Sequence, residues 1–341
     1  MSDFFDTVRR YLLDYLPNQK GFSGNTVKSY RQALNLFVTF LREHRHFSIK
    51  KINFDVLNRE IILDFLDYLE NERNCSATTR NHRLMVLRSF FDYAGIIDCT
   101  QVALTVTVRN VPVKSTQPKI VEFLPEVALE ALLKQPNPSK KKELRDLFYM
   151  VLMYDTAARC IEIKNMTVKD LRLNISHPIA YLHGKGGKTR TVPLLDKTVK
   201  HCKRYLGTFH SGETADSDAP LFYTMRNGLK RPMSEDNAAI FIEKYGTLAR
   251  TVCPEMPGHL HPHMLRHTRA MHLYHQGMPI MLLSEYLGHA SIESTKIYAY
   301  ADTEMKRAAI DKVAIGFDVT DSIMPIWEND DDMILKLSGL V

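Results

Sequence analysis

Residues 261–268 read His-Pro-His-Met-Leu-Arg-His-Thr and residues 287–298 read Leu-Gly-His-Ala-Ser-Ile-Glu-Ser-Thr-Lys-Ile-Tyr, and these two stretches decide which fold the sequence predicts. His263 and Arg266 are three residues apart, so a helix places both on one face. His289 lies nine residues before Tyr298. A tyrosine phenol is a nucleophile that can take up a phosphoryl group covalently.

A second group of charged residues precedes these stretches. Arg159 comes three residues before Glu162, and Lys185 lies in the glycine-rich segment 183–188 between two strand-like runs. Arg159 and Arg266 carry planar, permanent charges that suit two oxygens of one phosphate. Glu162 could hold such a guanidinium in place, and Lys185 on a hairpin turn could reach a leaving oxygen. Together with the tyrosine, this set predicts metal-free phosphoryl transfer, in which positive side chains take the place of Mg²⁺.

Each of these residues has a simpler interpretation when taken alone. An Arg-x-x-Glu pair is commonly a surface ion pair, a lysine in a glycine turn is commonly solvated, and a tyrosine at helical spacing commonly belongs to the core. The glycine turn could also suggest a nucleotide-binding loop, but it does not have the Walker spacing. The set as a whole therefore carries the prediction.

A zinc site is the other chemistry that the sequence raises, because six histidines lie between residues 259 and 275. They are His259, His261, His263, His267, His272 and His275. No HExxH motif occurs, no cysteine pair lies nearby, and Pro262 interrupts a shared helical face. We therefore expect no metal site and no cofactor.

Length and composition indicate a globular protein of about two domains. The 341 residues are 45% hydrophobic and 25% charged, as in ordinary globular chains. Five cysteines without a CxxC motif favour a reducing, cytoplasmic location over a disulfide framework. The acidic start is not typical of a signal peptide, and no apolar run is long enough to span a membrane.

The charge distribution suggests a polyanionic partner. Residues 1–310 hold 43 Lys and Arg against 32 Asp and Glu, whereas residues 311–341 hold 2 against 7. A basic body of this kind is typical of nucleic-acid binding, although solvated surface charge is the simpler alternative. The densest basic segment is 181–204, in which seven Lys and Arg accompany one Asp.

The apolar periodicity predicts a mainly α fold with a small antiparallel β-sheet. Residues 1–108 predict a bundle of four or five helices, with Gly95 at the end of the fourth. Residues 109–120 contain two prolines and three basic residues, and they predict an extended linker. Residues 121–313 predict a second domain, mostly helical, with short strands between 166 and 194, and residues 314–341 form a tail.

At this point the ordered set resembles the tyrosine site-specific recombinases, the phage-integrase and Xer family. The resemblance runs from about residue 3 to residue 312 and is closest in the second half. The family order is Arg, an acid three residues later, a hairpin Lys, His-x-x-Arg, His or Trp, and Tyr; here it reads Arg159, Glu162, Lys185, His263 to Arg266, His289 and Tyr298. The approach to Arg159 departs from the family's small-Gly-hydrophobic form, and we interpret Ala158 as a tolerated substitution.

The resemblance implies that Tyr298 attacks a scissile DNA phosphate, leaving a 3′-phosphotyrosyl link and a free 5′-hydroxyl. Arg159 and Arg266 would hold the non-bridging oxygens, and His289 would donate a hydrogen bond to one of them. Tyr300 is an alternative nucleophile, but the nine-residue step from His289 favours Tyr298.

Three further residues take roles under the same resemblance. Lys185 would protonate the departing 5′-oxygen, and His263 would assist proton transfer at the nucleophile. Glu162 would orient the arginine and the histidine. Neither ATP nor a metal is required, because the tyrosine link stores the energy of the phosphodiester.

The family fold further implies a C-shaped clamp on double-stranded DNA with a specific recombination site. A helical, SAM-like core-binding domain (1–108) would cover one face of the duplex and the catalytic domain (121–313) the other. DNA contacts are expected at Arg109, Lys114, Lys119, Lys188 and Arg190. Family members act as tetramers, so a homo-tetramer or a second, related recombinase is expected. The apolar segment 333–337 in the tail would dock on a neighbour or fold back on its own domain.

The subtype that fits best is the recombinase of a mobile element, for integration and excision. The bundle begins almost at residue 1, which argues against a lambda-type arm-binding domain, and the tail is longer than we expect of a housekeeping Xer protein. Xer-type resolution of chromosome or plasmid dimers is the alternative. A type IB-like topoisomerase and a catalytically silent DNA-binding protein are further alternatives, although the complete residue set argues against the last.

Overall fold

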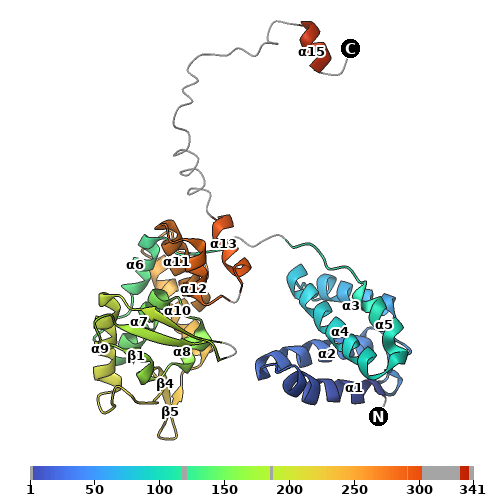
Figure 1. The fold of residues 1–341 in the computed structure, drawn as a ribbon, viewed down its shortest axis with the longest axis horizontal. Coiled ribbons are helices and arrows are strands. Elements are labelled where there is room, and N and C mark those ends of the chain that lie inside the picture. Colours follow the sequence, from blue (N-terminus) through green and yellow to red (C-terminus); the bar gives the residue numbers. More distant parts are fainter. Residues whose placement is uncertain (1–2, 117–120, 185–186, 290, 302–330, 338–341) are drawn as a thin grey trace. The chain divides into compact units, whose positions relative to one another are not determined.

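The chain forms two compact units, which divide at Pro118 within the predicted linker. The computed structural model describes residues 3–116, 121–184, 187–289, 291–301 and 331–337. The described residues are mostly helical, with one three-stranded and one two-stranded antiparallel sheet (Figure 1). The predicted fold class is therefore confirmed. Among these residues, no helix has both the length and the apolar character that crossing a bilayer requires.

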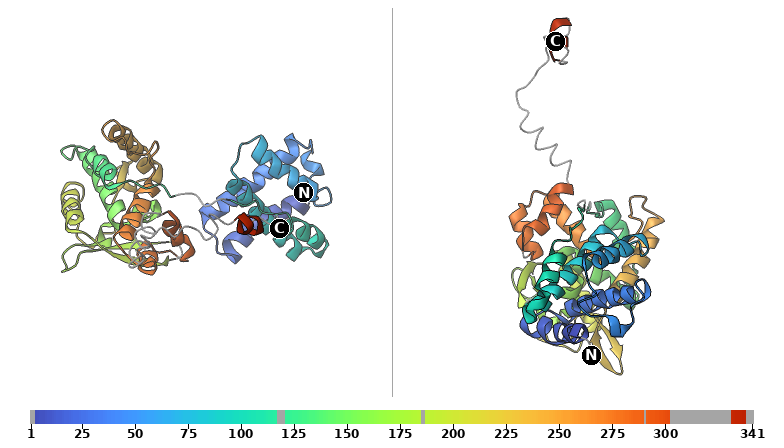
Figure 2. Two further views of the ribbon diagram at one scale, coloured as in Figure 1. Left: turned by 90° about the horizontal axis from the view of Figure 1, so that it is seen from above. Right: turned by 90° about the vertical axis from the view of Figure 1, so that its right-hand side faces the viewer.

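The first unit is a helical bundle around an aromatic core (Figures 1 and 2). Its helices are α1 (Asp3–Arg10), the π-helix η1 (Tyr11–Gln19), α2 (Gly24–Glu43), α3 (Arg59–Asn71), α4 (Ala77–Ile97) and α5 (Val102–Arg109), with 3-10 turns at Ile49–Lys51 and Cys99–Gln101. The side chains of Ser23, Asn58 and Ser76 cap α2, α3 and α4 by accepting the backbone N–H three positions on. These caps explain where the three longest helices of the unit begin.

Gly95 lies inside α4, so the predicted helix end at this glycine is wrong. A Cβ at this position would lie 2.8 Å from Oγ1 of Thr105 on α5. That hydroxyl is itself fixed, because it donates to the backbone oxygens of Phe91 and Gln101. The glycine therefore permits the close packing of α4 and α5 and does not terminate a helix.

The first half of the predicted linker packs on the first unit. Val111 is fully buried in the aromatic core. Arg109 is the last residue of α5 and pairs with Asp92 at 2.7 Å, and Lys114 pairs with Glu70 at 2.7 Å. Lys119 lies outside the described residues, as do most of residues 302–341.

The second unit surrounds a central helix, α7 (Lys141–Thr156). Its other helices are α6 (Glu126–Leu133), α8 (Cys160–Asn165), α9 (Asp196–Phe209), α10 (Glu235–Arg250), α11 (Pro262–His275), α12 (Ile280–Leu287) and α13 (Glu293–Ala301). The sheets join β1 (Leu171–Arg172), β2 (Ile179–His183) and β3 (Thr189–Pro193), and β4 (Tyr223–Arg226) with β5 (Leu229–Pro232). In the tail, the predicted docking segment 333–337 forms part of α15 (Asp331–Leu337).

Helix α11 is locked against α7 and against the segment that leads into α6. His272 of α11 meets the Tyr154 hydroxyl at 2.9 Å through Nδ1 and the Leu124 oxygen at 3.0 Å through Nε2. The Thr268 hydroxyl accepts the backbone N–H of Leu124 at 2.9 Å. These contacts fix the helix that carries Arg266 against the helix that leads to Arg159.

The close contact at Gly95 yields a test of helix packing. We expect Gly95→Ala to destabilise the chain by about 1–2 kcal/mol, because the clash with Thr105 exceeds the roughly 1 kcal/mol that alanine gains in helix propensity. Gly207→Ala on α9 is the matched control, since a Cβ there meets nothing within 4 Å. It should leave the stability equal or higher.

Urea unfolding followed by circular dichroism measures both variants. The cost of Gly95→Ala should shrink in a Thr105→Ala background, because the clashing hydroxyl is then absent. Equal stabilisation by the two glycine replacements would contradict the packing argument.

Candidate active site

The chain turns sharply between α7 and α8, and this turn presents Arg159. Ala157 has φ +47°, a left-handed conformation that costs a non-glycine residue about 1–2 kcal/mol. Ala157 is therefore the residue that stands where glycine is favoured. The Arg159 backbone N–H donates to Oε2 of Glu162 at 2.9 Å and starts α8.

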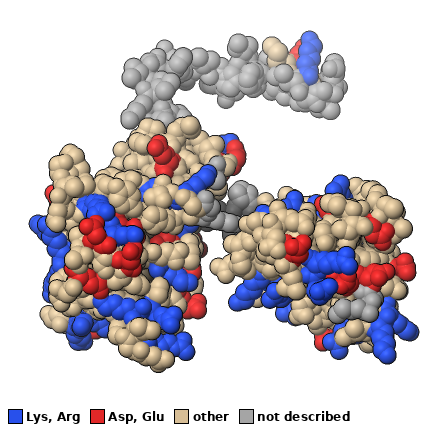
Figure 3. Space-filling model, turned by 60° about the horizontal axis from the view of Figure 1, so that its bottom comes forward, with Lys and Arg blue, Asp and Glu red and all other residues tan. Residues whose placement is uncertain are grey.

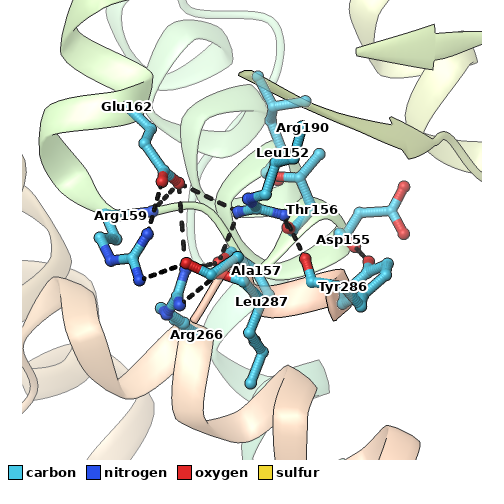
Figure 4. Close-up of polar contacts among 11 residues, drawn as sticks. Leu152, Asp155, Thr156, Ala157, Arg159, Glu162, Arg190, Arg266, Tyr286 and Leu287 are labelled. Atoms are coloured by element: carbon cyan, nitrogen blue, oxygen red, sulfur yellow. Dashed lines mark hydrogen bonds and ion pairs between the residues drawn. The ribbon is translucent and has the colours of Figure 1, made fainter. Parts of the chain in front are cut away.

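The buried carboxylate of Glu162 is the centre of the site (Figure 4). Its side chain is 1% exposed. Oε1 accepts from Nη1 of Arg159 at 2.8 Å, Oε2 accepts from Nη2 of Arg190 at 3.0 Å, and Nη1 of Arg266 lies 4.0 Å away. Burial raises the pKa of Glu162, but the charge of Arg190, the Arg159 N–H and the Arg159 charge outweigh it. The pKa is lowered, so the carboxylate stays ionised.

Arg266 and Arg159 also bind backbone oxygens at the ends of α7 and α12. Arg266 donates to the Ala157 oxygen at 2.6 Å and to the Leu287 oxygen at 2.7 Å, and Arg159 donates to the Gly288 oxygen at 3.1 Å. These oxygens belong to helix C-termini, which have unpaired carbonyls and a partial negative charge. Burial, then Arg159 and Arg190, lower the pKa of Arg266 to about 10, so it stays charged at neutral pH.

Arg190 was predicted to contact DNA, but its side chain is largely enclosed by the second unit. Its side chain is 13% exposed and points into the unit, where it donates to the oxygens of Thr156, Ala157 and Tyr286 as well as to Glu162. The reason is strand alternation: Arg190 shares the inner side of β3 with buried Val192, whereas Thr189 and Thr191 are exposed. That alternation is the sequence signal that could have placed it.

Tyr298 is buried in an apolar cluster that includes Ala157, Met271 and Leu287. Its hydroxyl lies 2.9 Å from Nδ1 of His267, a residue for which the sequence predicted no catalytic role. Burial raises the pKa of Tyr298 to about 12, although Arg266 and Arg159 oppose the rise. The phenol is therefore protonated at neutral pH.

His267 is also neutral at pH 7. Burial, then the charges of His263 and Arg266, lower its pKa to about 4. The sequence gives only a weak signal for its partnership with Tyr298, because the two residues are 31 positions apart.

The other two predicted histidines also lie beside the arginines. His289 meets the Thr295 hydroxyl at 2.8 Å through Nδ1. Burial, then Arg266 and Arg159, lower the pKa of His289 to about 4. His263 lies in the first turn of α11, and its pKa is lowered by desolvation and by the charge of Arg266.

The hairpin of β2 and β3 carries the predicted lysine. Lys185 itself lies outside the described residues, and Lys188 is exposed. His183 holds the base of the hairpin, since Nε2 meets Asp170 at 2.9 Å and Nδ1 meets Thr189 at 2.9 Å. The loop therefore starts from a fixed base.

The site combines three arginines, one carboxylate, a phenol and neutral imidazoles. Its charge leaves a net positive surplus, which suits a phosphoryl group with its negative oxygens. In the part of the chain that the structure describes, no three His, Cys, Asp or Glu side chains gather as metal ligands. Of the predicted catalytic residues that the structure describes, Arg159, Glu162 and Arg266 share direct contacts, and Tyr298 meets His267.

The two neutral histidines give a pH test of stability. Below pH 6.5 the unfolded chain binds protons at His267 and His289 that the folded chain binds only near pH 4. The free energy of unfolding should therefore fall as pH drops from 6.5 towards 4, by up to about 1.4 kcal/mol per pH unit for each histidine.

Urea unfolding at pH 7, 6 and 5 measures this slope. The double variant His267→Gln, His289→Gln should have a flatter dependence, because glutamine does not titrate. Identical slopes for the two proteins would contradict the burial of neutral histidines.

Sequence comparisons agree with this arrangement of residues. Residues 122–305 match the phage integrase family, and residues 9–98 match the phage integrase N-terminal SAM-like domain. A putative integrase/recombinase of Sinorhizobium fredii, y4rC, is 28% identical over 308 residues, which are 90% of this chain and 90% of the relative. The tyrosine recombinase XerC of Staphylococcus carnosus is 28% identical over 304 residues, 88% of this chain and 94% of the relative.

Solved structures share the fold. The Tn1549 transposon integrase in complex with transposon right end DNA has a TM-score of 0.68 at 17% identity, covering 92% of this chain and 100% of that chain. The XerH recombinase bound to palindromic difH substrate has a TM-score of 0.64 at 21% identity, covering 84% and 79%. Because the family match spans more than half of the sequence and includes the arginine site, the chain belongs to the phage integrase family and is a tyrosine site-specific recombinase.

Proposed function

We propose that this recombinase cuts and rejoins double-stranded DNA at a specific site through a 3′-phosphotyrosyl intermediate on Tyr298. The observation that carries the proposal is the placement of Arg159 and Arg266 on one buried carboxylate. The resulting surplus of positive charge favours an anionic ligand. The solved complexes of the Tn1549 integrase and of XerH with DNA support a DNA phosphate as that ligand.

In the proposed reaction, Arg159 and Arg266 bind the non-bridging oxygens of the scissile phosphate. His289 adds a hydrogen bond through Nε2. The bond from the Tyr298 oxygen to phosphorus forms while the bond from phosphorus to the 5′-oxygen breaks. The phenol proton leaves with help from His263, and Lys185 supplies a proton to the 5′-oxygen. Attack by the 5′-hydroxyl of a partner strand reverses the step, so no energy source is consumed.

Tyr298 has to be uncovered before it can attack. Its side chain is only 1% exposed, and the hydroxyl is occupied by His267. A DNA phosphate cannot reach an atom in this position. We therefore propose that DNA binding moves α13, the helix that carries Tyr298, relative to α11.

Binding of the duplex is proposed to depend on backbone contacts from both units. Lys and Arg side chains are spread over the face of each unit that Figure 3 shows, with acidic side chains between them. The Arg109 and Lys114 side chains are exposed although they pair with Asp92 and Glu70, so phosphates can bind these cations instead. Such binding should weaken steeply with salt.

The biological setting is proposed to be a mobile element whose recombinase acts in the cytoplasm as a tetramer on two sites. Its similarity to a transposon integrase supports this subtype, and its similarity to XerC and XerH keeps dimer resolution as the alternative. A type IB-like topoisomerase would relax supercoiled plasmid as a monomer. Relaxation without strand exchange would therefore favour that third possibility.

The nucleophile is tested with nicked suicide duplexes tiled over the DNA that flanks the chain's own gene. In EDTA, the wild-type chain should form a covalent protein–DNA band on a denaturing gel. Tyr298→Phe should abolish the band and change duplex affinity by less than about twofold, because the lost hydroxyl makes no phosphate contact before reaction.

Tyr300→Phe is the matched control and should keep the band. A band that survives in Tyr298→Phe but disappears in Tyr300→Phe would overturn the assignment of the nucleophile. No band from the wild-type chain on any duplex that it binds would count against the proposed reaction.

A further inference from the structure

We propose that Arg190 is a positioning residue of the recombination reaction, which it serves by holding the segment with Arg159 and the segment with His289 in one geometry. The inference rests on the proposed function. Arg190 contacts neither DNA nor the phenol in this proposal; it acts through the groups that it binds.

The contacts of Arg190 connect four elements. The residue comes from β3, and Nη1 donates to the Thr156 oxygen at 3.2 Å and to the Tyr286 oxygen. Nη2 donates to the Ala157 oxygen at 3.3 Å and to Glu162 at 3.0 Å. One guanidinium therefore ties the end of α7 and the carboxylate of α8 to the end of α12.

Arg190 also shares its acceptors with the residues proposed to bind phosphate. The Ala157 oxygen accepts from both Arg190 and Arg266. Oε2 of Glu162 accepts from Arg190 and from the Arg159 backbone N–H. A change at Arg190 must therefore alter how Arg159 and Arg266 are held, because it disturbs acceptors that they share.

Only an arginine can make this connection. Its donors form a rigid planar fork that reaches acceptors on several sides, whereas a lysine offers one nitrogen. The burial of Arg190 among two other cations is costly, and its hydrogen bonds offset that cost. The hydrogen bonds that Arg190 makes to α7, α8 and α12 explain why a cation is buried in this position.

Gly288 provides independent support for this interpretation. Gly288 has φ +62°, and a Cβ there would lie 2.7 Å from Cδ and 3.1 Å from Nε of Arg190. The backbone just before His289 therefore rests directly on the Arg190 side chain. Gly277 also has a positive φ, +87°, but a Cβ there would meet nothing within 4 Å. Both glycines have a positive φ, but only Gly288 also lies in close contact with a neighbouring side chain, that of Arg190.

The first experiment compares Arg190→Lys with Arg250→Lys in the full chain. Arg250 is a fair control because it also binds a carboxylate, Glu243, and a backbone oxygen, that of Pro257. The probe is the nicked duplex that the wild-type chain captures. At saturating protein, we expect Arg190→Lys to slow covalent capture by about tenfold or more and to leave duplex affinity within about twofold. Arg250→Lys should do neither.

Two further comparisons separate positioning from a general loss of fold. In a Glu162→Gln background, Arg190→Lys should slow capture by a much smaller factor, because the two residues act as one unit. Gly288→Ala should slow capture as Arg190→Lys does, whereas Gly277→Ala should not. Melting temperatures identify any variant whose defect is mere unfolding.

The outcomes distinguish this inference from the proposed function. Wild-type capture rates in Arg190→Lys, with Tyr298→Phe inactive, would overturn the role of Arg190 and leave the reaction intact. Losses that multiply fully with Glu162→Gln, or that fall equally on duplex affinity and capture, would also overturn it. Absence of any covalent band from the wild-type chain would instead refute the proposed reaction.

Discussion

The site depends on one buried carboxylate. Glu162 is ionised and enclosed, and it binds Arg159 and Arg190 directly while facing Arg266. One negative charge does not neutralise three guanidinium groups, so the carbonyl oxygens at the ends of α7 and α12 supply the remaining acceptors. Both helices therefore have to end beside the carboxylate. The left-handed residues Ala157 and Gly288 stop the helices at this place.

The surplus positive charge and the neutral histidines have a common origin. Arginines hold their protons even when burial lowers the pKa, as it does for Arg266. The same desolvation and the same neighbouring positive charges lower the pKa of His267 and of His289, so both imidazoles remain neutral. The fold thus separates permanent charge from neutral hydrogen-bonding groups within one site. A phosphate that enters finds charge already placed, which is the arrangement that stabilises a developing negative transition state.

The sequence predicted the fold class and the ordered set of residues, because apolar periodicity and short motifs are local signals. It failed where tertiary contacts decide. Gly95 looked like a helix end, but its partner Thr105 comes from another helix. Arg190 looked like one cation in a basic segment. The only sequence signal for its inward orientation is its position two residues before Val192, on the same side of β3. His267 is hydrogen-bonded to Tyr298 on a different helix, and sequence spacing does not predict such a contact.

Tyr298 and the charged centre are held by different kinds of contact. Within the described residues, the hydrogen bonds of Arg190 and Arg266 end on α7, α8 and α12, and none ends on α13. Tyr298 on α13 is instead held by apolar packing and by His267. The proposed movement of α13 would therefore break none of these arginine hydrogen bonds. Ala157 belongs to both groups, since its oxygen accepts from Arg190 and Arg266 and the residue packs in the apolar cluster with Tyr298, so the strained turn is the point where the two groups meet.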